Sequence, residues 1–245
     1  LFRDAGVNLL DNPDFNLWQR NTSMTAASGG DAGGTLTYPV PGTLTLGADR
    51  WQASRAKTDM TATISRATTN TLPTAEYVMK IAASAGNPCR FYIHQTLTRQ
   101  RTRGLRGKWV TFAVSHYLAG GTSGGNIALY KTVSGATTEL ARYTFVSTSN
   151  AWDRLAVAAQ VPTDADSLVV SIQPELSASG PSVAYLANAT LVEGKYVNAG
   201  ERVTDPTVSS VPPLPKDPAA DLEAGQRFYE KGSFYFTTSA ADTGT

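Results

Sequence analysis

The side chains that acid–base or metal chemistry would require are few and scattered in this sequence. His94 and His116 stand in no His-Glu-x-x-His, Gly-x-Ser-x-Gly or Cys-His arrangement, so we expect both to be neutral and hydrogen-bonded. The carboxylates are dispersed, and no spacing singles out two of them as the acid and base of a glycosidase. The sequence therefore predicts a protein that is not an enzyme, with no cofactor and no metal.

Composition excludes further classes of site. The single cysteine, Cys89, cannot form an intrachain disulfide or a thiolate metal cluster, and we expect it to be a small buried residue. The stretch Gly120–Gly125 lacks the Gly-Lys-Ser/Thr ending of a phosphate-binding loop, so we expect an exposed hairpin loop there, as at Gly29–Gly34. A net charge of +1 indicates neither nucleic acid nor a membrane surface as a partner. No apolar run approaches the roughly 20 residues that span a bilayer, so we expect no membrane insertion.

One short segment concentrates positive charge. Five cations fall between positions 99 and 108, and the favoured interpretation is a solvated loop. The alternative is contact with an anionic surface, such as phosphorylated lipopolysaccharide or an acidic neighbouring protein. The residues are Arg99, Arg101, Arg103, Arg106 and Lys108.

Aromatic side chains offer a different kind of chemistry, the stacking of sugar rings. Trp109 alternates with the apolar residues that follow it, so we expect it to face outward from a strand. Tyr92 and His94 occupy the outward phase of another strand for the same reason. Exposed aromatic residues suit either a glycan or a subunit interface, and we favour the interface. Trp18 and Trp51 are predicted to be core residues.

Short alternating segments separated by Gly, Asn, Pro and Asp position these residues. Period-2 alternation of this kind favours an all-β antiparallel sandwich over helical or parallel folds. The predicted strands cover Tyr77–Ala83, Arg90–Leu97, Trp109–Tyr117, Ile127–Thr132, Glu139–Val146, Asp153–Val161, Ser167–Gln173 and Ser182–Val192.

The sequence changes character after residue 202. Four prolines between positions 203 and 217 predict a semi-rigid linker, and Asp217-Pro218 predicts the start of a short helix over 218–231. The narrow apolar stripe of this helix cannot stabilise it alone, so it needs a partner surface. Residues 232–245 resemble the start of a further β segment. The stripe, with the phenylalanine beside it, comprises Leu222, Gln226, Phe228 and Tyr229.

Six short motifs, in order along the chain, resemble those of tail fibre and tail-tip proteins of tailed bacteriophages. The opening is marked by Asn8-Leu-Leu-Asp-Asn-Pro-Asp-Phe15 followed by Leu17-Trp-Gln-Arg20, and then by Ala48-Asp-Arg-Trp51. The later motifs are Leu105-Arg-Gly-Lys-Trp-Val-Thr-Phe112, Ala151-Trp-Asp-Arg154 before Val161-Pro-Thr163, Ala189-Thr-Leu-Val-Glu-Gly194 and Ala224-Gly-Gln-Arg-Phe-Tyr-Glu-Lys231.

This resemblance implies a jelly-roll sandwich similar to carbohydrate-binding modules, over residues 1–202, on a homotrimeric fibre or tail-tip protein. Its partners would be copies of itself, other phage tail proteins and a bacterial surface glycan or lipopolysaccharide. Its location would be the virion, and the extracellular space after release. The chain departs from the pattern at Gly225, where a cysteine is usual, and at Asn188, where related modules often carry an Asp that holds calcium.

Three functions remain as alternatives. The first is a structural virion protein that also contributes to host attachment, and the linker with its helix favours it. The second is a free carbohydrate-binding module of a secreted bacterial protein. The third is a fragment of a phage polysaccharide depolymerase, although the sequence shows no fixed-period repeat of a β-helix.

Overall fold

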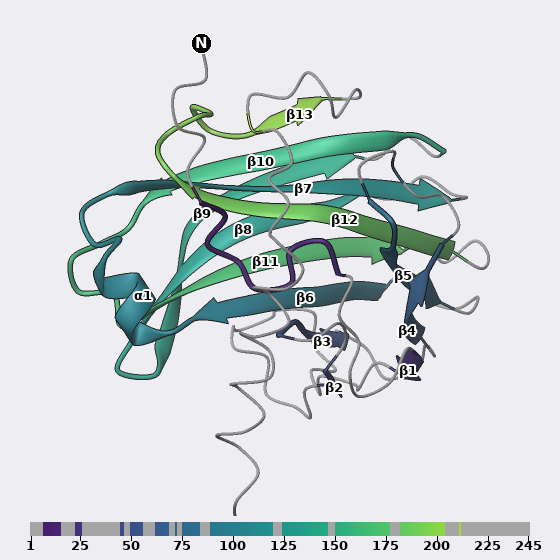
Figure 1. The fold of residues 1–245 in the computed structure, drawn as a ribbon, viewed down its shortest axis with the longest axis horizontal. Coiled ribbons are helices and arrows are strands. Elements are labelled where there is room, and N and C mark those ends of the chain that lie inside the picture. Colours follow the sequence, from purple (N-terminus) through teal and green to yellow (C-terminus); the bar gives the residue numbers. More distant parts are fainter. Residues whose placement is uncertain are drawn as a thin grey trace, which may run out of the picture.

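A computed structural model of the chain shows two antiparallel β-sheets packed face to face (Figure 1). It describes residues 7–15, 23–25, 45–46, 50–55, 62–68, 72, 75–83, 89–119, 124–146, 150–176, 182–203 and 211. The predicted helix 218–231, the tail 232–245 and Trp18 lie outside these residues, as does the linker apart from Val203 and Val211. Among the described residues no helix is long and apolar enough to cross a membrane.

The two sheets contain seven and six strands. The seven-stranded sheet is formed, in spatial order, by β1 (Ser23–Thr25), β4 (Ala62–Ala67), β5 (Val78–Ala83), β12 (Ser182–Glu193), β7 (Trp109–Ala119), β10 (Trp152–Gln160) and β13 (Glu201–Val203). The six-stranded sheet is formed by β2 (Thr45–Leu46), β3 (Gln52–Arg55), β6 (Cys89–Leu97), β11 (Ser167–Leu176), β8 (Gly124–Val133) and β9 (Ala136–Val146). One short helix, α1 (Arg99–Arg103), follows β6.

The strand order confirms a jelly-roll. From β5 to β12, the eight central strands are divided so that one sheet holds β5-β12-β7-β10 and the other β6-β11-β8-β9. This is the double Greek-key arrangement of a jelly-roll sandwich. The inward phase of each strand fills the space between the sheets with side chains such as Phe91, Ile93, Phe112, Leu155 and Ile172.

The eight predicted strands all form, with bounds within a few residues of those expected. Two expectations were wrong in detail. Gly124 and Gly125 belong to β8 rather than to a hairpin loop, because a Cβ at either position would collide with the backbone of Phe145 or Gln173. Helix α1 replaces part of the expected solvated loop, with Thr98 accepting a hydrogen bond from the Arg101 amide as its N-cap.

Residues 7–15 run between β12 and β6 and join the two sheets (dark purple in Figure 1). The Leu9 amide donates to the Leu191 carbonyl of β12 over 2.9 Å. On the other side, the Gln95 side chain of β6 accepts from the Asp11 amide and donates to the Asp11 carbonyl, both over 2.8 Å. The Gln95 side chain thus supplies the hydrogen bonds that the backbone of a neighbouring strand would otherwise give to this segment. This explains why a polar residue stands on the inward phase of β6.

Trp51 and Phe15 anchor the same segment in the core, as predicted for Trp51. Both side chains are fully buried, and their ring centroids lie 4.9 Å apart. The Trp51 indole donates to the Asn12 carbonyl over 2.9 Å. Phe15 has a positive φ of 56°, a costly conformation for a bulky residue that the burial of its ring offsets.

A bulge in β12 receives hydrogen bonds from both sides. The register shifts between Ala187 and Thr190, and Asn188 has a φ of 51°. On one side Asn8 donates to the Ala189 carbonyl and accepts from the Leu191 amide. On the other, the fully buried Arg154 guanidinium donates to the Asn188 carbonyl, Thr190 Oγ1, Ser115 Oγ and the Val211 carbonyl.

The second histidine, His116, lies in the core and not in a polar network. Its ring packs edge-on against Phe145 with centroids 5.0 Å apart, and neither ring nitrogen has a hydrogen-bond partner. Burial, and secondarily the charge of Arg202, lowers its pKa to about 4. His116 is therefore neutral, as expected, but its nitrogens are unsatisfied, although the buried Asp153, paired with Arg202, lies opposite it on β10.

We expect Asn8→Ala to reduce the free energy of unfolding by about 2–3 kcal/mol, because it leaves the buried Leu191 amide and Ala189 carbonyl without these partners. Urea denaturation followed by tryptophan fluorescence measures this. Asn198→Ala, on an exposed asparagine, is the matched control and should change stability by less than about 0.5 kcal/mol. Equal effects of the two substitutions would contradict the joining role of residues 7–15.

His116 should make the fold less stable in acid. Its folded pKa of about 4 lies below the unfolded value of 6.5, so the unfolded chain binds the extra proton as pH falls between these values. Stability is therefore retained above pH 6.5 and lost toward pH 4. Relative to wild type, His116→Phe should gain about 2 kcal/mol between pH 7 and pH 4.5. A stability difference that does not change with pH in urea titrations would refute this.

Candidate functional site

Trp109 faces outward from the seven-stranded sheet, as predicted. Its side chain is 36% exposed, whereas the alternating Val110 and Phe112 are fully buried in the core. The Lys195 ammonium lies 4.5 Å from the centre of the Trp109 ring, a cation–π contact that occupies one of its faces. The role of Trp109 in a glycan site or an interface stays a prediction.

Tyr92 and His94 lie on the opposite sheet from Trp109, so the three aromatic residues do not form one surface. They point outward from β6, as the alternation predicts. The expectation that they are exposed was wrong, because their side chains are only 3% and 4% accessible. The reason is their position in the middle of the sheet, where strands β3 and β11 crowd them on both sides.

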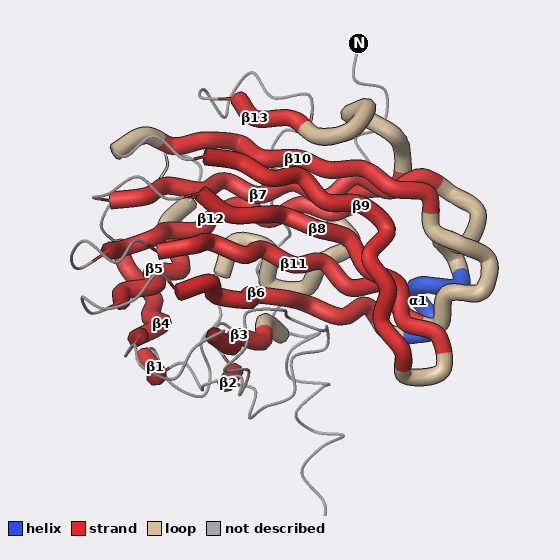
Figure 2. The backbone as a smooth tube through the Cα atoms, turned by 180° about the vertical axis from the view of Figure 1, so that it is seen from behind, coloured by secondary structure: helices blue, strands red, loops and turns tan. Residues whose placement is uncertain are grey.

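Around Tyr92 and His94, the outward side of the six-stranded sheet carries a continuous set of polar and aromatic side chains (Figure 2 shows this sheet from behind). One cross-strand row runs Gln52, His94, Ser171, Ala128 and Arg142 over five neighbouring strands. We call this surface the polar face. Its members are Gln52, Arg90, Tyr92, His94, Asn126, Ala128, Tyr130, Glu139, Arg142, Thr144, Val169, Ser171, Gln173 and Glu175.

Hydrogen bonds within the polar face hold its side chains in place. Gln173 Nε2 donates to the Tyr130 hydroxyl over 2.9 Å and to Ser171 Oγ over 3.2 Å. On the next strands Thr144 Oγ1 donates to Asn126 Oδ1 over 2.7 Å. The face therefore combines fixed amide and hydroxyl groups with tyrosine rings, the combination that an uncharged polar ligand requires.

Burial keeps the titratable groups at the centre of the polar face uncharged. It lowers the pKa of His94 to about 4, so the neutral ring hydrogen-bonds Gln52 Oε1 over 2.9 Å. It raises the pKa of Tyr92 to about 12, with the neighbouring Arg90 opposing the shift. The buried Tyr92 hydroxyl lies beside Arg90 and lacks a well-formed hydrogen bond.

Charges on the polar face occur at its borders and in pairs. Arg90 donates to Glu175 over 2.6 Å between β6 and β11. Arg142 donates through Nε to Glu139 over 2.9 Å within β9, at the opposite border. All four side chains are between 34% and 39% exposed, so both pairs are accessible to a ligand.

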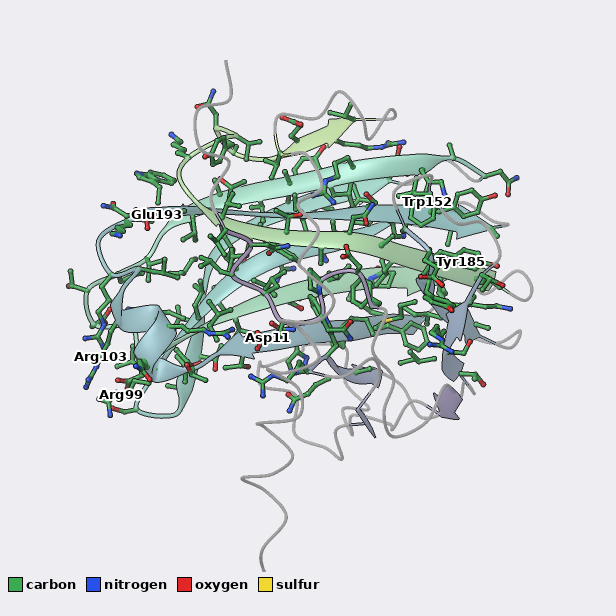
Figure 3. All side chains as sticks on the ribbon, viewed as in Figure 1. Asp11, Arg99, Arg103, Trp152, Tyr185 and Glu193 are labelled. Carbon is green, nitrogen blue, oxygen red and sulfur yellow. The ribbon has the colours of Figure 1, made fainter. Side chains whose placement is uncertain are left out.

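The basic segment from Arg99 to Lys108 is not a free cationic surface. Arg99 and Arg106 both contact Asp166. Arg101 contacts Asp11, which also binds Arg50, and Lys108 contacts Glu193. Figure 3 shows Arg99 and Arg103 at the α1 end of the sandwich, and among the described residues Arg103 is the member of the segment without an ion pair. Little unpaired positive charge in this segment is therefore left for the predicted contact with an anionic surface.

No group of three or more potential ligand residues in the described parts of the chain is arranged to hold a metal ion. At Asn188, where the resemblance raised the question of calcium, the Arg154 guanidinium donates to the main-chain carbonyl. The cationic partner of that carbonyl is therefore a side chain. Cys89 lies in β6, but its side chain is outside the described set, as are the helix residues Leu222, Gln226, Phe228 and Tyr229.

The sequence pattern missed most of the polar face. Ser171 and Gln173 alternate with the inward residues of a predicted strand, so their outward direction was available from the sequence. Arg142 and Asn126 come from strands whose pairing with that one was unknown. The missing information was the order of the strands in the sheet, which alternation does not contain.

Comparison with known proteins gives a likeness of fold. No family model and no curated protein matches the chain. A carbohydrate-binding module from the β-sandwich superfamily is 14% identical over 61% of this chain and 58% of its own, with a TM-score of 0.45. TmCBM61 in complex with β-1,4-galactotriose is 14% identical over 77% and 100%, with a TM-score of 0.44. The enzymatically active domain of bacteriophage CBA120 tailspike protein 4 is 15% identical over 59% and 19%, with a TM-score of 0.42. The chain thus spans just over half of the length of the β-sandwich carbohydrate-binding module structure named first.

Proposed function

We propose that this chain is a non-enzymatic glycan-binding module, and that it serves host-surface attachment as part of a phage tail fibre or tail tip. The observation that carries the glycan-binding half is the polar face. It presents accessible donors and acceptors from Gln52, Thr144 and the two ion pairs, held beside a layer of buried amides and hydroxyls on one side of the sheet. A sugar presents the same mixture of hydroxyl groups and apolar CH surfaces.

The direction of the side chains supports a ligand site over a purely structural surface. A sheet side that faced only water would need no cross-strand network. Gln173 is almost inaccessible and is bonded to two side chains, so it holds the groups beside it in place and does not meet a ligand itself. Fixed polar groups reduce the entropy lost when a ligand binds, so they increase affinity. In contrast, the Trp109 ring on the other sheet is already in contact with the Lys195 ammonium.

The attachment half of the proposal is supported by the motif resemblance. Three residues of these motifs stabilise the fold: Asn8 bonds β12, Trp51 bonds the Asn12 carbonyl, and Arg154 bonds the Val211 carbonyl. On this proposal the protein is located in the virion and is extracellular after release. A free carbohydrate-binding module would share the polar face but would not need to form a trimer.

Binding should be lost when the polar face is changed and retained when Trp109 is changed. We expect Arg142→Ala to weaken glycan binding by about tenfold, the effect of losing one to two hydrogen bonds to a charged group. Gln173→Ala should act in the same direction, and circular dichroism checks its folding. Trp109→Ala is the control on the other sheet. Isothermal titration with a glycan found by array screening measures all three. Loss of binding in Trp109→Ala alone would assign the site to the other sheet.

The full 245-residue chain should be a trimer by multi-angle light scattering. Leu222→Asp should convert it to a monomer with an unchanged circular dichroism spectrum of the sandwich, because a charge in the helix stripe opposes association. Asn198→Ala serves as the surface control. A wild-type monomer would contradict the fibre proposal and favour a free module.

A further inference from the structure

The polar face contains equal numbers of cationic and anionic side chains, already paired. Glu175 binds Arg90 and Glu139 binds Arg142, at 2.6 and 2.9 Å. The other polar members of the face are the hydroxyl residues Thr144 and Ser171, three amides and the three ring residues Tyr92, His94 and Tyr130. Among the described members of the polar face, each guanidinium therefore has a carboxylate beside it.

The neutral state of the central groups extends this balance over the whole face. His94 is buried, and it gains no charge until the pH falls to about 4. Strand β8 carries a lysine, Lys131, but its side chain is on the inward phase of the sheet and contacts Asp164 at 2.7 Å. A ligand on the polar face thus meets no uncompensated charge at neutral pH.

Acidic glycans have a different requirement. The carboxylate of a uronic acid or a phosphate group is best bound by a guanidinium that is free to form two parallel hydrogen bonds. Here it would have to compete with Glu175 or Glu139 for the arginine, and it would approach a like charge at a few ångströms. A neutral sugar has no such conflict, because one hydroxyl accepts from the arginine while its neighbour donates to the glutamate.

We propose that the polar face binds neutral glycans through adjacent hydroxyl groups seated on the ion pairs Arg90–Glu175 and Arg142–Glu139, and excludes acidic glycans. This inference rests on the proposed glycan-binding function and names its substrate class. The ion pairs act as specificity determinants: each supplies one donor and one acceptor to a hydroxyl pair, and each glutamate blocks its arginine from an anionic group.

A gain-of-binding experiment tests this more sharply than a loss. Glu175→Gln keeps the shape of the side chain and frees Arg90, so it should create affinity for uronic acid polymers such as polygalacturonate. Glu193→Gln is the matched control, since it frees Lys108 on a surface away from the polar face. The readout is binding of the full chain to an array of neutral and acidic glycans, from about 0.05 to about 0.5 M NaCl.

The wild-type chain should bind neutral glycans with less than about twofold dependence on salt, because no net charge is involved. Glu175→Gln should gain at least about tenfold affinity for polygalacturonate, lost at high salt, and Glu193→Gln should gain none. Salt-sensitive binding of acidic glycans by wild type, lost in Arg142→Ala, would overturn the inference while leaving the glycan-binding function intact. Failure of the wild-type chain to bind any glycan on the array would overturn the proposed function and this inference with it.

Discussion

The irregularity in the middle of β12 is the constraint on which the rest of the sandwich depends. β5 pairs only with the Ser182–Leu186 half of β12, so beyond it the strand has a free edge inside the molecule. The bulge at Asn188 turns that edge so that residues 7–15 can bond to it on one side and Arg154 on the other. Asparagine tolerates the positive φ that this turn requires better than most side chains do.

Arg154 connects the bulge in β12 to residues on the outer surface of the seven-stranded sheet. Burial lowers its pKa to about 9, so the side chain remains a cation at neutral pH with Asp14 and Glu201 supporting its charge. A buried cation is stabilising only when its donors are satisfied, and Arg154 reaches two carbonyls and two hydroxyls. Through the Val211 carbonyl it also fixes a residue beyond β13, and Val211 covers Ala113 and Ala156 on the outside of the sheet.

The sequence predicted the strands well because alternation depends only on neighbouring residues. It predicted Trp51 as core and Trp109 as outward for the same reason. It did not predict that Gln95 bonds the backbone of Asp11, since the two residues are 84 positions apart. The exposure of Tyr92 and the composition of the polar face were likewise out of reach, because both depend on which strands become neighbours. Local pattern thus gives the direction of a side chain, whereas strand order decides what surrounds it.

Strand order also explains why paired charges recur on this protein. An antiparallel sheet places residues of distant segments directly opposite each other, and Glu175 faces Arg90 in this way. Lys108 and Glu193, in the turn before β7 and on β12, are brought together by the same geometry, as are Arg202 and Asp153, on β13 and β10. Pairs at the borders of the polar face cost little to form, because about a third of each side chain remains in water. They therefore add little to stability, and under the proposed function their role is the arrangement of donors and acceptors that they offer to a glycan.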